Sequence, residues 1–226
     1  TNLYHYAGTG HLAVDYARLM QLGFDGLRQR AQQKLAALDM HDPEFCTKRE
    51  FYQAVLIMYG AVEQYILRYA ALAEEMAARE QEAKRKAELE QIAANCRAVA
   101  GGAPKTFWQA LQLFHFATML ICVESNGHSI SYGRMDQWLY PYYEADKGIS
   151  KEFALELLEV EYVKLNNPTK LKDAGSMALR NGRGFGGESL TIGGVKRDGT
   201  DATNDLTMLM LEASAHTRMM NPWVCV

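Results

Sequence analysis

Residues 124–143 read ESNGHSISYGRMDQWLYPYY, and this stretch carries most of the fold prediction. It combines two glycines and three serines with five aromatic side chains, and it follows the most apolar part of the chain, residues 114–123. A surface loop rarely carries so many aromatic residues, and a core helix rarely contains Asn-Gly-His-Ser. The stretch therefore predicts a turn that leads back into the packed interior and brings polar groups with it.

The composition excludes several classes of protein. The 226 residues are 48% hydrophobic and 23% charged, with a net charge of −3. This near balance argues against a nucleic-acid partner, because such surfaces need an excess of Lys and Arg. No apolar run approaches the ~18 residues that span a membrane. We therefore expect neither a nucleic-acid partner nor a membrane partner.

The four cysteines and six histidines show no metal-ligand spacing. There is no CxxC, HxH or HxxxH motif, which argues against a zinc site. Disulfide frameworks are typical of small secreted chains. We expect a cytoplasmic protein with reduced thiols and no metal.

Both ends of the sequence read as cuts through a longer polypeptide. The chain opens on TNLYHY, with neither a methionine nor a signal peptide, and closes on the apolar run NPWVCV. Because natural termini are usually polar and exposed, we expect the fold to be incomplete at both ends.

Apolar residues that recur at three- and four-residue steps predict a helix-rich chain. Thr47 and Glu50 have the spacing of a capping box at the start of a long helix that ends near Arg79. Ser150 and either Thr203 or Asn204 are expected to cap two later helices. The predicted helices cover residues 16–38, 48–79, 87–99, 106–124, 133–143 (interrupted near Pro141), 151–165 and 205–219.

Two apolar segments in the second half predict strands. Residues 189–195, SLTIGGV, read as one strand before a polar turn at 196–200, and residues 224–226 begin another. The alternation of helix and strand predicts the α/β class, with a barrel-like arrangement whose remaining strands follow downstream. We expect residues 1–226 to be one incomplete domain.

A glycine-rich run at residues 182–187, GRGFGG, suggests a place where the backbone approaches a ligand closely. It does not predict a phosphate loop, because a strand follows it and GK[ST] is absent. Arg180, Arg183, Phe185 and Glu188 are therefore candidates to line a pocket.

Two histidines stand apart from the other four. His11 and His128 each follow a glycine in a turn-rich polar setting, whereas the others are expected to be structural. We include His11 among the candidate substrate-binding residues.

Two further pairs have competing interpretations. Cys122 and Glu124 could form a nucleophile and its base, but Cys122 ends an apolar helix, where burial disfavours a thiolate. We expect a buried structural cysteine. Arg134 and Asp136 could bind an anion, but we expect an internal ion pair that braces the core.

Four ordered blocks resemble the glycyl radical enzymes of the pyruvate formate lyase-like group. Residues 124–143 are similar to a segment that these enzymes share, and the resemblance extends over essentially the whole chain. The other blocks are GTGHLAVDY at 8–16, FWQALQLF at 107–114, and LTIGG at 190–194 followed by DATNDLT at 201–207.

The resemblance implies a partial α/β barrel wrapped by helices around the active site. It also implies a backbone glycyl radical, installed by a partner radical-SAM activating enzyme, that oxidises a cysteine to a thiyl radical. The thiyl radical abstracts hydrogen from a small substrate. No other bound cofactor is expected, and the full-length protein is expected to be a homodimer.

The catalytic motifs of the family are absent from these residues. Neither Gly-Cys-x-Glu nor Arg-Val-x-Gly-aromatic occurs, and Cys122 lacks the preceding glycine. We therefore expect no catalytic residue in this chain, both radical positions after Val226, and no activity from these residues alone.

The substrate is not decided by the sequence. Residues 166–173 and 180–188 look most similar to lyases that release sulfite from isethionate, and Arg180 or Arg183 would suit a sulfonate. This favours C–S cleavage of isethionate or a related sulfonate. The alternatives are an arylacetate decarboxylase, a choline or diol lyase, a formate acetyltransferase and, in another class, a non-catalytic helical scaffold.

Overall fold

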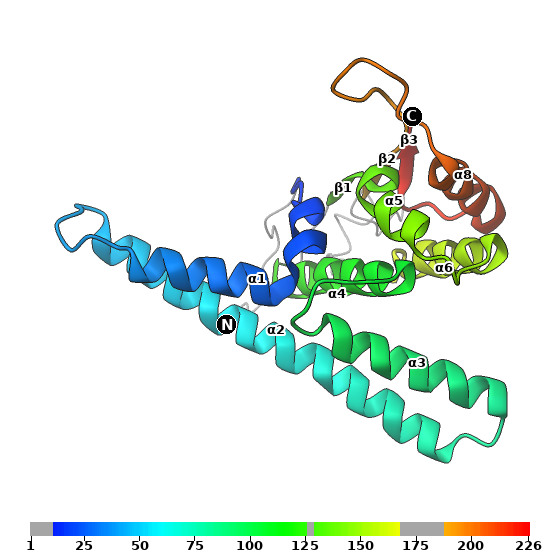
Figure 1. The fold of residues 1–226 in the computed structure, drawn as a ribbon, viewed down its shortest axis with the longest axis horizontal. Coiled ribbons are helices and arrows are strands. Elements are labelled where there is room, and N and C mark those ends of the chain that lie inside the picture. Colours follow the sequence, from blue (N-terminus) through cyan, green and yellow to red (C-terminus); the bar gives the residue numbers. More distant parts are fainter. Residues whose placement is uncertain (1–10, 126–128, 168–187) are drawn as a thin grey trace, which may run out of the picture. The chain divides into compact units, whose positions relative to one another are not determined.

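The computed structural model describes residues 11–125, 129–167 and 188–226, and it is rich in helix with a small parallel sheet (Figure 1). The chain forms two compact units, one of residues 17–105 and one of residues 1–16 with 106–226. Among the described helices, none combines the length and the apolar character that crossing a membrane requires. The helices are α1 (Tyr16–Ala36), α2 (Phe45–Arg79), α3 (Ala83–Val99), α4 (Phe107–Ser125), α5 (Met135–Ala145), α6 (Lys151–Lys164) and α8 (Asp205–Thr217), and the strands are β1 (Ser131–Arg134), β2 (Ser189–Thr191) and β3 (Trp223–Cys225).

In the unit of residues 17–105, the long helix α2 packs against α3, which returns beside it (Figure 1). The buried face of α2 includes Ala70, Ala73 and Ala77, whose small side chains allow close packing of the two backbones. The expected end of α2 at Arg79 is confirmed.

The expected starts of these two helices are wrong. α2 begins at Phe45 without a side-chain cap, because Asp42 already forms the preceding turn: its carboxylate accepts the Glu44 N–H and its carbonyl accepts the Phe45 N–H. The predicted capping box at Thr47 therefore lies inside the helix. α3 begins at Ala83, four residues earlier than expected.

A glycine makes the bend in α1 possible (Figure 1). Gly23 has a φ of 61°, and a Cβ placed on it would lie 2.4 Å from the backbone carbon of Gly102. The next turn is fastened by Asp25 N–H, which donates to Gly101 O at 2.7 Å. Only glycine fits both the left-handed backbone and this close approach.

In the other unit, three described strands form a parallel sheet in the order β1-β2-β3. Ser189 is in register with both Ser131 of β1 and Trp223 of β3, and Ala13 bridges Ser131 on the other side. β2 ends at Thr191, earlier than expected, because the following Gly193 has a φ of 66° and turns the chain.

The opening stretch supplies the aromatic core of this unit. Tyr132 of β1 and Trp138 of α5 pack with Tyr16 and with Phe114 of α4 at ring-centroid distances of 5.1–6.3 Å. Trp138 Nε1 also donates to the Tyr132 carbonyl at 3.0 Å. The predicted return of this stretch to the interior is confirmed.

The expected helix boundaries in this unit are partly correct. Ser150 caps α6 through Phe153 N–H, and Asn204 caps α8 in a reciprocal box with Thr207. The expected interruption at Pro141 is wrong, since α5 continues to Ala145. Pro141 is exposed, so water can satisfy the carbonyl that loses its helical partner.

Candidate active site

The candidate site lies at the edge of the sheet where its parallel strands begin. The backbone of Ser131 donates to Leu12 O at 2.7 Å, and that of Ser189 donates to Ile130 O at 3.2 Å. Because parallel strands start at a common edge, the residues just before each strand lie next to one another. Three segments from distant parts of the sequence meet here.

His11 and Ser129 occupy equivalent positions at this edge, each two residues before the bridged pair Ala13 and Ser131. Their φ angles are 56° and 55°, in the left-handed region that few residues other than glycine adopt. Such a backbone costs about 1 kcal/mol or more and is concentrated at functional sites. His11 is exposed and Ser129 is partly exposed.

Glu188 brings a buried carboxyl group to the same edge. It directly precedes β2, is 6% exposed, and accepts the Trp223 N–H at its carbonyl. Its charge raises the pKa of the Tyr132 hydroxyl and of the Cys122 thiol, in both cases after the larger effect of burial. The two predicted residues His11 and Glu188 thus lie, with Ser129, at the same edge of the sheet.

The Cys122 thiol has a raised pKa. Burial, followed by the charge of Glu188, raises its pKa from 9.0 to about 11, so the thiol is protonated near neutral pH. It is half-buried rather than fully buried, which corrects one part of the prediction.

Helix α4 carries a polar face that was not predicted from the sequence. His115 Nδ1 lies 3.1 Å from Glu161 Oε1, and Thr118 Oγ1 lies 2.9 Å from the Tyr16 hydroxyl. His115, Thr118 and Cys122 are spaced by three and four residues, so they share one side of the helix. Polar residues at this spacing within an apolar helix were the signal that could have revealed the face.

The predicted ion pair between Arg134 and Asp136 is wrong, because both side chains bind the backbone that follows β2. Arg134 donates to the carbonyls of Gly193 and Val195. Asp136 Oδ2 accepts the Gly193 N–H at 2.8 Å and the Thr207 hydroxyl at 2.5 Å. The two side chains therefore brace one turn without pairing with each other.

Several predicted site residues lie outside the described residues. They are Arg180, Arg183, Phe185, the glycine run 182–187 and His128. In the described part of the chain, no group of three or more His, Cys, Asp or Glu side chains is placed to hold a metal ion.

The family model described as pyruvate formate lyase-like matches residues 1–226. The chain belongs to this family. The resemblance seen in the sequence is thereby confirmed, and so is the expected partial α/β barrel, because the structural relatives of this family superpose on nearly all of the chain.

The family members that resemble this chain are enzymes. Over 100% of the chain it is 68% identical to a (2S)-3-sulfopropanediol dehydratase from Klebsiella oxytoca, of which it covers 28%. Over 88% of the chain it is 39% identical to an isethionate sulfite-lyase from Oleidesulfovibrio alaskensis, of which it covers 25%. A glycerol-bound, B12-independent glycerol dehydratase from Clostridium butyricum superposes with a TM-score of 0.91 and 41% identity, over 98% of this chain and 28% of that one. The chain thus spans little more than a quarter of the length of these relatives.

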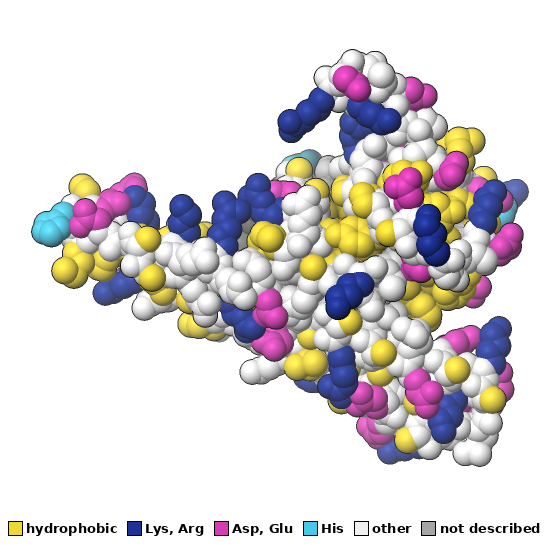
Figure 2. Space-filling view, in the orientation of Figure 1, with side chains coloured by type: hydrophobic (Ala, Val, Ile, Leu, Met, Phe, Trp, Pro, Cys, Tyr) yellow, Lys and Arg dark blue, Asp and Glu magenta, His cyan; other side chains and the backbone are white. Residues whose placement is uncertain are grey.

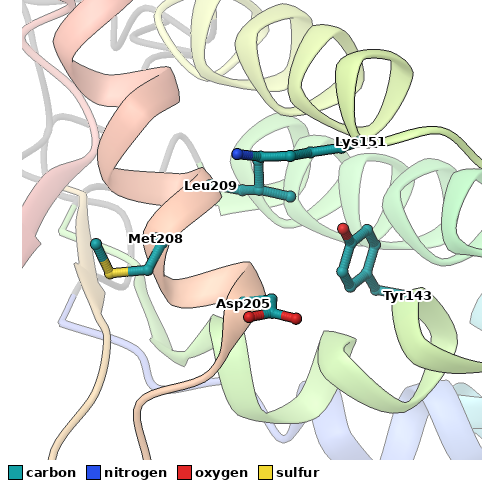
Figure 3. A pocket seen from close by; sticks show the side chains of 5 residues that line it. All are labelled: Tyr143, Lys151, Asp205, Met208 and Leu209. Atoms are coloured by element: carbon teal, nitrogen blue, oxygen red, sulfur yellow. The ribbon is translucent and has the colours of Figure 1, made fainter.

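This chain also has an open pocket of about 290 Å³ that is lined by residues of its helices (Figure 3). It is lined by Tyr143 of α5, Lys151 of α6, and Asp205, Met208 and Leu209 of α8. Figure 2 shows hydrophobic side chains gathered over α5 and α8. Neither His11 nor Glu188 is among the described residues that line this pocket.

Proposed function

We propose that the full-length protein is a glycyl radical lyase that removes water from a small sulfonated diol, with (2S)-3-sulfopropanediol as the leading substrate. The observation that carries this proposal is the 68% identity to the dehydratase over the entire chain. Identity to the isethionate lyase is 39%, so C–S cleavage of isethionate becomes the second candidate. In the proposed reaction the diol loses one hydroxyl group and one hydrogen as water and leaves a sulfonated aldehyde.

The charges at the edge of the sheet suggest how such a substrate is oriented. Glu188 is a buried carboxyl whose charge raises the pKa of Cys122, so an anionic sulfonate is disfavoured next to it. The hydroxyl end of the diol suits this position, since a carboxylate accepts hydrogen bonds from hydroxyl groups. His11 supplies a second polar group at the same edge.

The sulfonate end then needs cationic groups. Arg180 and Arg183 are proposed for this role, because a guanidinium binds a sulfonate through paired, charge-assisted hydrogen bonds. Their assignment rests on charge and on sequence position.

We further propose that residues 1–226 form part of one domain, whose catalytic cysteine and radical glycine follow Val226. The chain contains neither family motif, and the relatives are more than three times longer. The glycyl radical, installed by a radical-SAM enzyme, supplies hydrogen abstraction, and no such step is assigned to a residue of this chain. A cytoplasmic homodimer completes the proposal.

The test uses the full-length protein, activated without oxygen by a radical-SAM activating enzyme, and offers the diol and isethionate in parallel. We expect a sulfonated aldehyde from the diol and little sulfite from isethionate. Rapid sulfite release, with no reaction of the diol, would favour the second candidate. Turnover of neither sulfonate would refute both.

A further inference from the structure

Asn221 is a buried polar residue with unmet hydrogen-bonding capacity. It is 2% exposed, and neither its Oδ1 nor its Nδ2 has a hydrogen-bond partner in the part of the chain that the structure describes. Burying an unpaired polar group is unfavourable, and natural proteins contain few of them. An unpaired carboxamide in the interior therefore calls for an explanation.

The backbone of Asn221 is held firmly. Asn166, just after α6, accepts the Asn221 N–H through Oδ1 at 3.3 Å and donates from Nδ2 to the Asn221 carbonyl at 2.7 Å. The same Nδ2 donates to the Tyr162 carbonyl at 2.8 Å. Among the described residues, the main-chain N–H and carbonyl of Asn221 both have partners, whereas its side chain has none.

Asn221 lies at the same edge of the sheet as Glu188. Ser189 of β2 and Trp223 of β3 are register partners, and Trp223 N–H donates to Glu188 O at 2.9 Å. Asn221 precedes Trp223 by two residues, and Glu188 directly precedes Ser189. Both therefore lie just before parallel strands that start together.

We propose that the Asn221 carboxamide binds the hydroxyl groups of the substrate. This inference rests on the proposed function. A carboxamide offers a donor and an acceptor, and two neighbouring hydroxyl groups match both. A sulfonate offers acceptors alone, so it would leave Oδ1 unpaired. Asn221 is therefore a specificity residue for the diol end.

Substitutions of Asn221 can distinguish a role in substrate binding from a role in packing alone. Leucine has nearly the same shape as asparagine and has no polar atoms. Replacing unpaired buried polar atoms with an apolar group of the same shape is neutral or stabilising. Asn221→Leu should therefore keep or raise the stability while it removes the binding group. Asn166→Ala is the matched control, because it removes the backbone clamp.

The experiment measures binding of (2S)-3-sulfopropanediol to the full-length, unactivated protein by calorimetry, with Tm recorded for each variant. We expect the native protein to bind the diol. The Asn221→Leu variant should bind it at least 10-fold more weakly, with an equal or higher Tm. The Asn166→Ala variant should have a lower Tm. In the activated enzyme, KM should rise at least 10-fold in the Asn221→Leu variant. Asn221→Ala serves as the second variant if the leucine variant does not fold.

The outcomes separate the two proposals. Unchanged diol binding by a folded Asn221→Leu or Asn221→Ala variant overturns the assignment of Asn221 and leaves the proposed function intact. Failure of the native protein to bind the diol overturns the proposed function, and the assignment of Asn221 with it.

Discussion

Asp136 Oδ2 lies 2.8 Å from the backbone nitrogen of Gly193, which is 57 residues away in the sequence. The same oxygen accepts the hydroxyl of Thr207 in the first turn of α8. One fully buried carboxyl group therefore joins α5, the turn after β2 and the start of α8.

Replacing Asp136 should destabilise this unit strongly. Asp136→Ala leaves a buried N–H and a buried hydroxyl without their acceptor, which costs about 3 kcal/mol or more. Asp136→Asn keeps an acceptor of similar shape and should lose less. Urea unfolding of the full-length protein measures both changes. Equal stability of the alanine variant and the native protein would contradict this role.

Gly23→Ala should destabilise the helical unit by about 2–4 kcal/mol, since it combines left-handed backbone strain with a clash against the Gly102 backbone. Gly60→Ala in α2 is the control, because a Cβ there meets no atom within 4 Å. The Gly60→Ala substitution should leave the stability of the protein unchanged or raise it slightly. Thermal unfolding compares the two variants, and equal shifts in Tm would argue against the close approach at Gly23.

The Cys122 thiol should titrate at high pH. Its pKa is raised to about 11 by burial and then by the charge of Glu188, so its alkylation should accelerate up to about pH 11. Folding raises this pKa, so its contribution to stability is complete below pH 9 and is lost as the pH rises toward 11.

The contribution of Glu188 to this pKa can be tested separately. Glu188→Gln removes the negative charge, which should lower the pKa of Cys122. Mass spectrometry of the peptide that contains Cys122, after alkylation at several pH values, gives the midpoint. The same midpoint in both proteins would show that Glu188 does not act on Cys122.

The His11→Gly substitution should lower the activity without lowering the stability of the protein. Glycine removes the left-handed strain and should leave stability unchanged or raise it by up to about 1 kcal/mol. If the edge is the active site, loss of the imidazole should lower kcat/KM of the activated full-length enzyme at least 10-fold. A variant with native kcat/KM would remove His11 from the site. Arg218→Gly, at another left-handed position, is the matched control for strain.

Local signals predicted much of the fold. The end of α2 at Arg79 and the caps at Ser150 and Asn204 depend on neighbouring residues, and all three are confirmed. Contacts between distant segments were harder to predict. Arg134 finds its acceptors 59 and 61 residues away, so its pairing with the nearby Asp136 was the wrong inference.

The candidate site was predictable only in part, for the same reason. His11 and Glu188 were chosen from local sequence, but their shared edge depends on the register of parallel strands. The unpaired side chain of Asn221 could not be inferred from sequence, because burial and hydrogen-bond satisfaction appear only in the folded chain.

The most direct test is product analysis with the activated full-length protein supplied with (2S)-3-sulfopropanediol. The proposal predicts a glycyl radical signal in electron paramagnetic resonance and conversion of the diol to a sulfonated aldehyde without release of sulfite. A clear radical signal with an unchanged diol, or with sulfite as the product, would contradict it.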